Sequence, residues 1–270
     1  MNTLLITGAA GIVGTALRPY LRQHYRLRLL DRRPVEGLAE GETALVGDLT
    51  DAAFVEQAVH GCQAVLHLAC AHGTEIAFTA TLEPNYHATL YLLEAAQRHG
   101  VQRFVFTSSH HVLGQYRTDA APVFDDMPPA PDSYYALSKV FGEAACAAWS
   151  LRYNLGTWVI RIGNADAQVS DARRLRLWTS ARDLAQLVRI GLEHPEVKHE
   201  VVYGVSDCPR ALFSNARARA LGYRPQDNAA EHLAPGFLSY EAMAAETSGR
   251  DYIGGAYAGA PLAPLLEPKA

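Results

Sequence analysis

Two residues four positions apart, Tyr135 and Lys139, have the types and the spacing for proton transfer. On a helix such residues share one face, so the phenol and the ammonium would be neighbours. A nearby cation favours phenolate, and we expect Lys139 to lower the pKa of Tyr135 from about 10 toward neutral pH. A tyrosine of this kind acts as a general acid or base. Ser108 and Ser109, about 26 residues earlier, end an apolar stretch and supply hydroxyls for the same chemistry.

The N-terminal stretch reads as a strand, a glycine turn and a helix. Four apolar or β-branched residues lead into Gly8, Gly11 and Gly14, and apolar residues at helical spacing follow. In such a turn the backbone N–H groups and the positive end of the helix dipole face a pyrophosphate. We expect Gly8 to allow the tight turn, Gly11 the approach of phosphates, and Gly14 close packing of the helix. Because plain β–α turns also contain glycines, a dinucleotide site is predicted only if an acidic residue ends the next strand.

Asp31 meets this condition, because it ends the predicted strand 27–31 and lies 23 residues after Gly8. An acid at this distance hydrogen-bonds the adenosine ribose and repels a 2′-phosphate, which favours NAD. Arg32 and Arg33 follow at once and are alternative ligands for that phosphate, so NADP stays open. Asp48, after a third strand at 43–47, is placed to contact the adenine edge.

Alternating strands and helices continue along the chain, with strands predicted at 64–69, 103–109 and 157–162 and helices at 82–100 and 132–153. This pattern predicts an α/β fold with a doubly wound parallel sheet, whose ligands bind at the carboxyl ends of the strands.

Past residue 165 the pattern loosens. It predicts a helix over 181–193, a short strand over 200–203 and two small helices near Ser214 and Leu238. We therefore expect a dinucleotide-binding domain over residues 1–165, and a small C-terminal lobe over 166–270 that is intertwined with it and shapes a substrate pocket.

Composition narrows the choice of partners. The net charge of −4 and the lack of a basic stripe argue against nucleic acid. The four cysteines lie far apart, as expected of reduced thiols. The first strand begins too early for a signal peptide, and no apolar run reaches the length of a membrane span. These features predict a soluble cytoplasmic protein.

The combination of motifs resembles the extended short-chain dehydrogenase/reductases, which have a Rossmann-type sheet. The resemblance implies that Ser109 polarises the reacting oxygen, Tyr135 moves the proton, Lys139 tunes Tyr135 and holds the nicotinamide ribose, and Asn85 supports a proton relay. It also implies a set of contacts to NAD, from Gly8, Ala10, Gly11, Ile12, Val13, Gly14, Asp31, Arg32, Asp48, Leu49, Leu68, Ala69, Cys70, Asn85, Thr107, Tyr135, Lys139 and Ile162.

Within that group the chain is most similar to the uronate dehydrogenases, which oxidise hexuronic acids at C1 to aldarolactones. The likeness rests on residues 108–114, 159–163, 173–180, 201–204 and 221–228. It implies that Arg173 holds the substrate carboxylate through a bidentate pair. Three substrate positions depart from the family: His72 stands where the family has serine, His110 where it has asparagine, and Asn164 where it has serine. The implied substrate contacts are His72, Ser109, His110, His111, Tyr135, Asn164 and Arg173, of which His72, His110 and Asn164 are the departures.

The histidines and Arg173 also allow other interpretations. His67, His72, His110 and His111 converge on strand ends, but no carboxylate or cysteine completes a zinc site, so we expect no metal. His67, in mid-strand, is expected to be a hydrogen-bonded core residue. Arg173 alternatively belongs to a solvated face.

The alternative functions are a dehydrogenase of another aldose or a sugar phosphate, a nucleotide-sugar epimerase or dehydratase, and a non-catalytic NAD-sensing protein. The short C-terminal region argues against the second, and the presence of all three predicted catalytic residues argues against the third. The resemblance also implies a homo-oligomer.

Overall fold

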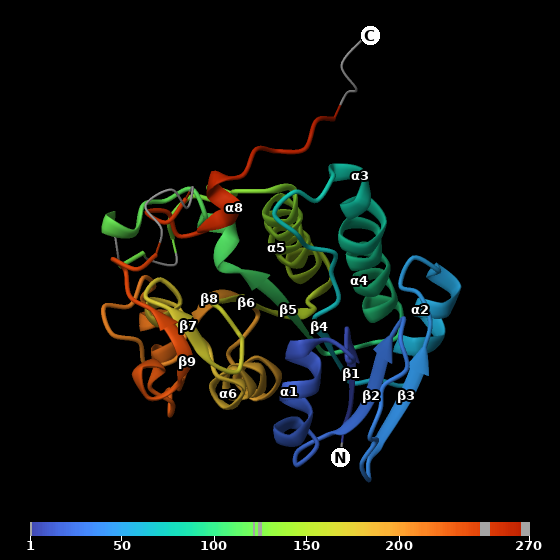
Figure 1. The fold of residues 1–270 in the computed structure, drawn as a ribbon. Helices are drawn as coiled ribbons and strands as arrows, with labels where there is room; N and C mark the ends of the chain where they lie inside the picture. The colour runs from blue at the N-terminus through green and yellow to red at the C-terminus, as the bar shows by residue number, and fades with distance from the viewer. Residues whose placement is uncertain (1, 121, 124–125, 244–248, 266–270) are drawn as a thin grey trace.

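The computed structural model describes residues 2–120, 122–123, 126–243 and 249–265. Seven parallel strands form the main sheet in the order β3-β2-β1-β4-β5-β6-β8 (Figure 1). After β3 the chain returns to the middle of the sheet and builds the other half from β4, so the predicted doubly wound topology is confirmed. The strands are β1 (Thr3–Thr7), β2 (Arg26–Asp31), β3 (Glu42–Val46), β4 (Ala64–His67), β5 (Arg103–Ser109), β6 (Gly156–Ile162) and β8 (His199–Gly204).

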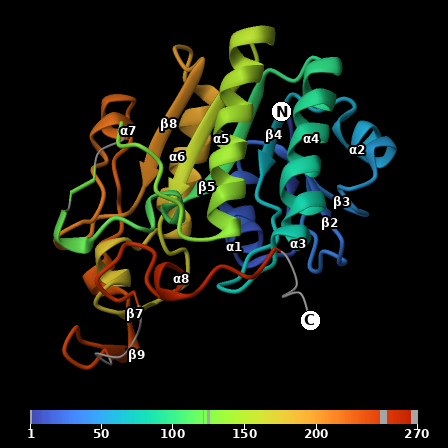
Figure 2. The ribbon, with the colours of Figure 1, turned by 90° about the horizontal axis from the view of Figure 1, so that it is seen from above.

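Helices cover both faces of this sheet (Figures 1 and 2). On one face lie α1 (Ile12–Leu21) and α6 (Ala181–Glu193), and on the other α2 (Ala52–Val59), α4 (Ala88–Arg98) and α5 (Tyr134–Tyr153). Each layer buries its own apolar core, which is why the central strands are apolar on both sides. None of the described helices is long and apolar enough to cross a membrane.

Side chains define where these helices begin. Asp51 accepts from the backbone N–H groups of Ala53 and Phe54 at the start of α2. Ser133 caps α5 by accepting from Ala136 N at 3.1 Å. This cap fixes the first turn of the helix that carries Tyr135.

The helix predicted over 82–100 is interrupted. It begins as α3 (Phe78–Thr81), passes through a π-helical turn (Leu82–His87), and continues as α4. Pro84 lies in that turn and has no N–H to donate to a regular helix, which accounts for the wider turn. Gly100, with φ of +68°, ends the helix as predicted.

The C-terminal third differs most from the prediction. The predicted strand 200–203 and helix 181–193 are β8 and α6, which belong to the main sheet and its covering layer. The predicted helix near Leu238 is wrong, because this segment is β9 (Leu233–Leu238), which pairs with β7 (Val169–Asp171). The backbone partners of β9 lie some sixty residues away in the sequence. The short helices are α7 (Ala216–Ala220) and α8 (Ala256–Gly259), and 3₁₀ turns occupy His110–Leu113, Thr118–Ala120, Arg174–Arg176 and Ala229–Glu231.

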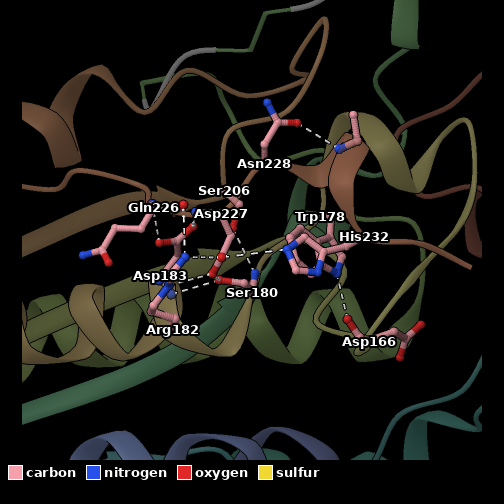
Figure 3. A network of polar contacts seen from close by, with 11 residues as sticks. Asp166, Trp178, Ser180, Arg182, Asp183, Ser206, Gln226, Asp227, Asn228 and His232 are labelled. Atoms are coloured by element: carbon pink, nitrogen blue, oxygen red, sulfur yellow. Dashed lines mark hydrogen bonds and ion pairs between the residues drawn. The ribbon is translucent and has the colours of Figure 1, made fainter.

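A polar network ties the chain after β6 to the start of α6 (Figure 3). Trp178 donates from Nε1 to the carbonyl of Asp166 at 2.7 Å, and its ring stacks on His232 with centroids 4.7 Å apart. The buried carboxylate of Asp183 accepts from the backbone N–H groups of Gln226 and Asp227. The two backbone bonds offset the cost of burying the Asp183 charge, and the bond from Trp178 holds the loop that contains Asp166.

His67 is a core residue, as predicted. Its Nδ1 lies 2.7 Å from Thr7 Oγ1 and its Nε2 3.2 Å from Thr89 Oγ1. Burial, with the nearby charge of Lys139, lowers the pKa of His67 to about 3. The imidazole is therefore neutral in the folded protein.

This burial predicts a dependence of stability on pH. Between the unfolded pKa of about 6.5 and the folded value only the unfolded state binds the proton, so stability is lost as pH falls through this window. At about pH 5 the loss due to His67 is about 2 kcal/mol. A His67→Asn variant, which has no proton to bind, should lose about 2 kcal/mol less than the parent between about pH 7.5 and about pH 5. Urea unfolding at both pH values measures this, and equal losses would show that His67 does not titrate as described.

Candidate active site

A cavity of about 710 Å³ follows the carboxyl ends of the central strands. It runs from the glycine turn to the residues that follow β5 and β6. Of the predicted site residues, Ala10, Asn85 and Arg173 lie outside its lining. The structure brings the others together around it: Gly8, Gly11, Ile12, Val13, Gly14, Asp31, Arg32, Asp48, Leu49, Leu68, Ala69, Cys70, His72, Thr107, Ser109, His110, His111, Tyr135, Lys139, Ile162 and Asn164.

The glycine turn is packed too closely for side chains. Gly8 has φ of +72°, and a Cβ there would lie 2.7 Å from the backbone nitrogen of Ala69. A Cβ on Gly14 would lie 2.5 Å from the carbonyl oxygen of Gly8. Gly11 begins α1 with no side-chain cap, so the first N–H groups of the helix have no side-chain acceptor. They are placed to bind a phosphate group.

Asp31 is held at the same end of the cavity by backbone donors. Its Oδ2 accepts from Ala10 N and its Oδ1 from Arg33 N, both at 3.0 Å. The guanidinium of Arg33 turns back to the carbonyl of Ala10 at 2.9 Å. Asp31 Oδ1 also forms an ion pair with Arg33 Nε at 3.7 Å, whereas Oδ2, with one backbone donor, has a second lone pair for a ribose hydroxyl. The uncapped helix, the glycine cradle and this carboxylate together fit a dinucleotide such as NAD.

Tyr135, Lys139 and Ser109 meet in the middle of the cavity. The side chains of all three line it, and Ser109 Oγ accepts from the backbone N–H of His111 at 3.3 Å. Lys139 Nζ donates to the carbonyl of Thr107 at 2.7 Å and lies 5.6 Å from the centroid of the Tyr135 ring. Asn85, behind the cavity, bonds to both backbone groups of Ala71 and so holds the loop after β4.

The pKa of Tyr135 differs from the expectation. Burial raises it well above its usual value, because a buried phenolate loses its hydration, and the nearby Ser109 hydroxyl opposes this shift. The charge of Lys139 is shared with the carbonyl of Thr107. In the structure the pKa of Tyr135 is therefore shifted in the direction opposite to the one expected from Lys139.

Two unpaired acceptors line the far end of the cavity. His110 Nδ1 lies 3.2 Å from the carbonyl oxygen of Ile162, which only accepts, so Nδ1 carries the proton. Its Nε2 is buried without a partner among the described residues. Asn164 Nδ2 donates to Asp166 at 3.0 Å, and its Oδ1 is likewise unpartnered within the described chain. Both atoms are suited to accept hydrogen bonds from hydroxyl groups of a ligand.

His72 and His111 complete this end. The ring of His72 lies 5.9 Å from that of Tyr135, centroid to centroid. His111 Nδ1 lies 2.6 Å from Asp132 Oδ2, and its ring packs on Tyr257 with centroids 4.1 Å apart. In the part of the chain that the structure describes, no group of three or more histidine, cysteine or acidic side chains is arranged to hold a metal ion.

Arg173 is half-buried and lies beside this end rather than on a solvated face. Its Nη1 donates to the carbonyl of Ile253 at 2.7 Å, and it has no ion pair within the described ranges. Burial, with the neighbouring charge of Arg174, lowers its pKa to about 10, so it remains charged at neutral pH. Burial lowers the pKa values of His110 and His111, and the charge of Arg173 lowers them further. A guanidinium in such a position favours an anionic ligand.

Sequence reasoning missed Asp132 and Tyr257. Asp132 directly precedes the cap of α5, and that position was the one local signal for it. Tyr257 had none, because the C-terminal segment reaches the site through non-local backbone bonds. These run from Ile253 N to Tyr116 O and from Gly254 N to Gly114 O.

Comparison with known proteins places this site in a family. The sequence pattern described as "NAD dependent epimerase/dehydratase family" matches residues 4–168. The chain belongs to this family. The predicted resemblance to the extended short-chain dehydrogenase/reductases, and among them to the uronate dehydrogenases, is thereby confirmed together with the matches that follow.

The chain is 40% identical to a uronate dehydrogenase of Pseudomonas putida, over 95% of this chain and 96% of that one. It is 34% identical to an NAD-dependent glucose-6-phosphate dehydrogenase of Haloferax volcanii, over 84% and 94% of the two chains. Among solved structures, a variant of the uronate dehydrogenase of Agrobacterium tumefaciens complexed with NAD superposes with a TM-score of 0.87. It is 30% identical and covers 97% of this chain and 98% of that one.

The packing of Asp132 leads to a test of the site's geometry. A Cβ on Gly114 would lie 1.8 Å from Asp132 Oδ2, so Gly114→Ala must push the carboxylate away from His111. We expect this variant to lose about 1–3 kcal/mol of unfolding free energy, measured by urea denaturation. Gly236→Ala is the matched control, because a Cβ there meets nothing within 4 Å. A Gly114→Ala variant as stable as the control would contradict the described packing.

Proposed function

We propose that the protein oxidises a hexuronic acid at C1 to the aldarolactone with NAD as hydride acceptor. The observation that carries the proposal is the guanidinium of Arg173, which has no ion pair among the described residues. Its charge acts on His110 and His111, which line the same cavity as Tyr135, Lys139 and Ser109. A carboxylate at one end of a sugar and an oxidisable carbon at the other fit these two features. The likeness to proteins named uronate dehydrogenase supports it.

The residues at the reacting end supply the proton chemistry. NAD⁺, when bound, supplies the hydride acceptor and a positive charge near the phenol. Tyr135, as phenolate, takes the proton of the C1 hydroxyl, and Ser109 hydrogen-bonds the same oxygen. Lys139, 5.6 Å from the ring centroid, adds its charge in favour of phenolate.

The residues at the far end hold the substrate. Arg173 pairs with the carboxylate in a charge-assisted bond, and this fixes the sugar with C1 toward Tyr135. His110 Nε2 and Asn164 Oδ1 accept from sugar hydroxyls that would otherwise leave them unpaired. Because these two side chains depart from the uronate dehydrogenase pattern, the preferred stereoisomer of the acid is where we expect this protein to differ.

A second candidate is a dehydrogenase of a sugar phosphate. The relative from Haloferax volcanii named for glucose 6-phosphate favours it, and a guanidinium binds phosphate as readily as carboxylate. Rates with glucuronate and with glucose 6-phosphate, compared under the same conditions, separate the two.

We also propose a cytoplasmic location, which the free state of all four cysteines supports. The homo-oligomer stays a prediction of the family resemblance.

The carboxylate role of Arg173 is tested by Arg173→Ala. Loss of a charge-assisted pair should raise KM for a uronic acid by about tenfold to a hundredfold, with much less effect on a neutral aldose. Initial rates of NAD reduction, followed by the absorbance of the reduced cofactor, give both constants. Arg176→Ala is the matched control, because Arg176 donates to the carbonyl oxygens of Arg210 and Thr118. Equal effects of Arg173→Ala on acid and neutral sugar would refute the carboxylate pair.

A further inference from the structure

We propose that Asp132 is a positioning residue that holds the His111 imidazole with its hydrogen on Nδ1 and a lone pair on Nε2. His111 is then an acceptor for a hydroxyl of the bound sugar. The identity of that ligand rests on the proposed function, whereas the tautomer of His111 does not.

The contact joins the two elements that carry the reacting groups. Asp132 directly precedes Ser133, the cap of α5, and His111 lies in the 3₁₀ turn that follows β5. Asp132 Oδ2 and His111 Nδ1 are 2.6 Å apart, and the side chain of Asp132 is fully enclosed. Bonding between them fixes the orientation of the imidazole ring relative to α5.

The carboxylate has no room to turn away from His111. Positions where a Cβ would stand on Gly114 and Gly254 lie 1.8 and 1.9 Å from Asp132 Oδ2, so two glycines from separate segments make space for it. The other oxygen, Oδ1, accepts from the hydroxyl of Ser133 at 2.9 Å. The Ser133 hydroxyl is itself oriented, because its oxygen accepts from Ala136 N at 3.1 Å.

The charges around the pair favour an ionised carboxylate and a neutral ring. Arg173 and the positive end of the α5 dipole face Asp132, while the rings of Tyr257, Tyr135 and His110 surround His111. Burial raises the pKa of Asp132 to about 6, and burial with the charges of Arg173 and its neighbours lowers that of His111 to about 3. Above about pH 6 an ionised carboxylate only accepts, so the hydrogen lies on Nδ1.

This tautomer sets what the cavity recognises. His111 lines the cavity, and with Nδ1 turned to Asp132, Nε2 is the ring nitrogen left for a ligand. It joins the unpaired Nε2 of His110 and Oδ1 of Asn164, so three acceptors surround one end of the site and Arg173 supplies a cation beside them. The matching ligand class is a polyhydroxylated acid whose hydroxyls donate. A ligand without those hydroxyls leaves buried acceptors unpaired, at a cost in affinity.

Asp132→Asn reverses the arrangement with almost no change in shape. The Ser133 hydroxyl donates to Oδ1 of residue 132, so it retains the amide oxygen on that side. The amide NH₂ then faces His111 Nδ1 and donates to it, which moves the ring hydrogen to Nε2.

Nitrogen NMR of protein labelled in histidine tests the tautomer directly, with the His111 signals assigned by their absence in His111→Phe. We expect a protonated Nδ1 and an unprotonated Nε2 in the parent at about pH 7.5, and the reverse in Asp132→Asn. An unprotonated Nδ1 in the parent would overturn the proposal, whether or not the enzyme turns over any sugar acid.

A double-mutant cycle with a uronic acid tests the consequence. Asp132→Asn should lower kcat/KM about tenfold or more in the parent, and less than about threefold in a His111→Phe background, where no tautomer is left to set. Equal losses in both backgrounds would mean that Asp132 acts only on the fold, and would overturn the positioning role. A parent that oxidises no uronic acid would refute the proposed function instead, leaving the NMR result to decide the tautomer.

Discussion

The docking of α5 on β5 and β6 is the contact on which the rest of the site depends. Glu143 on α5 pairs with Arg161 on β6, with Oε2 and Nη2 at 2.8 Å, and accepts from the hydroxyl of Ser108 at 2.5 Å. Removing one partner of such a buried pair leaves the other charge uncompensated, so the pair sets how the helix lies against the strands. Glu143 lies two turns after Tyr135 on α5, and Ser108, which donates to it, lies one residue before Ser109 on β5. This registration brings Tyr135 and Ser109 to the same cavity.

The two ends of the cavity offer different binding groups, mainly backbone at one end and side chains at the other. At the glycine turn the chain offers N–H groups and one carboxylate, with no room for a side chain at Gly8 or Gly14. At the far end it offers buried imidazole and amide acceptors and the cation of Arg173. The first arrangement suits a dinucleotide that many related proteins share. The second contains His110 and Asn164, which depart from the uronate dehydrogenase pattern, and we propose that it sets the substrate preference of this chain.

Local patterns in the sequence were enough to predict the sheet, the glycine turn and the proximity of Tyr135 to Lys139. Each depends on periodicity or on spacing within one element. The pairing of β7 with β9 and the arrival of Tyr257 at the site depend on contacts between distant segments, which no local pattern encodes. The local sequence also does not show which side chains are buried. Burial raises the pKa of Tyr135, which Lys139 was expected to lower. Burial also removes Arg173 from the solvated face that its neighbouring arginines suggested.

The most direct test of the account compares glucuronate with glucose, which share C1 and differ in the carboxylate. We expect NAD to be reduced with both sugars, with kcat/KM about tenfold to a hundredfold higher for glucuronate, and we expect Tyr135→Phe to lower both rates by at least about a hundredfold. Equal kcat/KM for the two sugars, or a Tyr135→Phe variant as active as the parent, would contradict it.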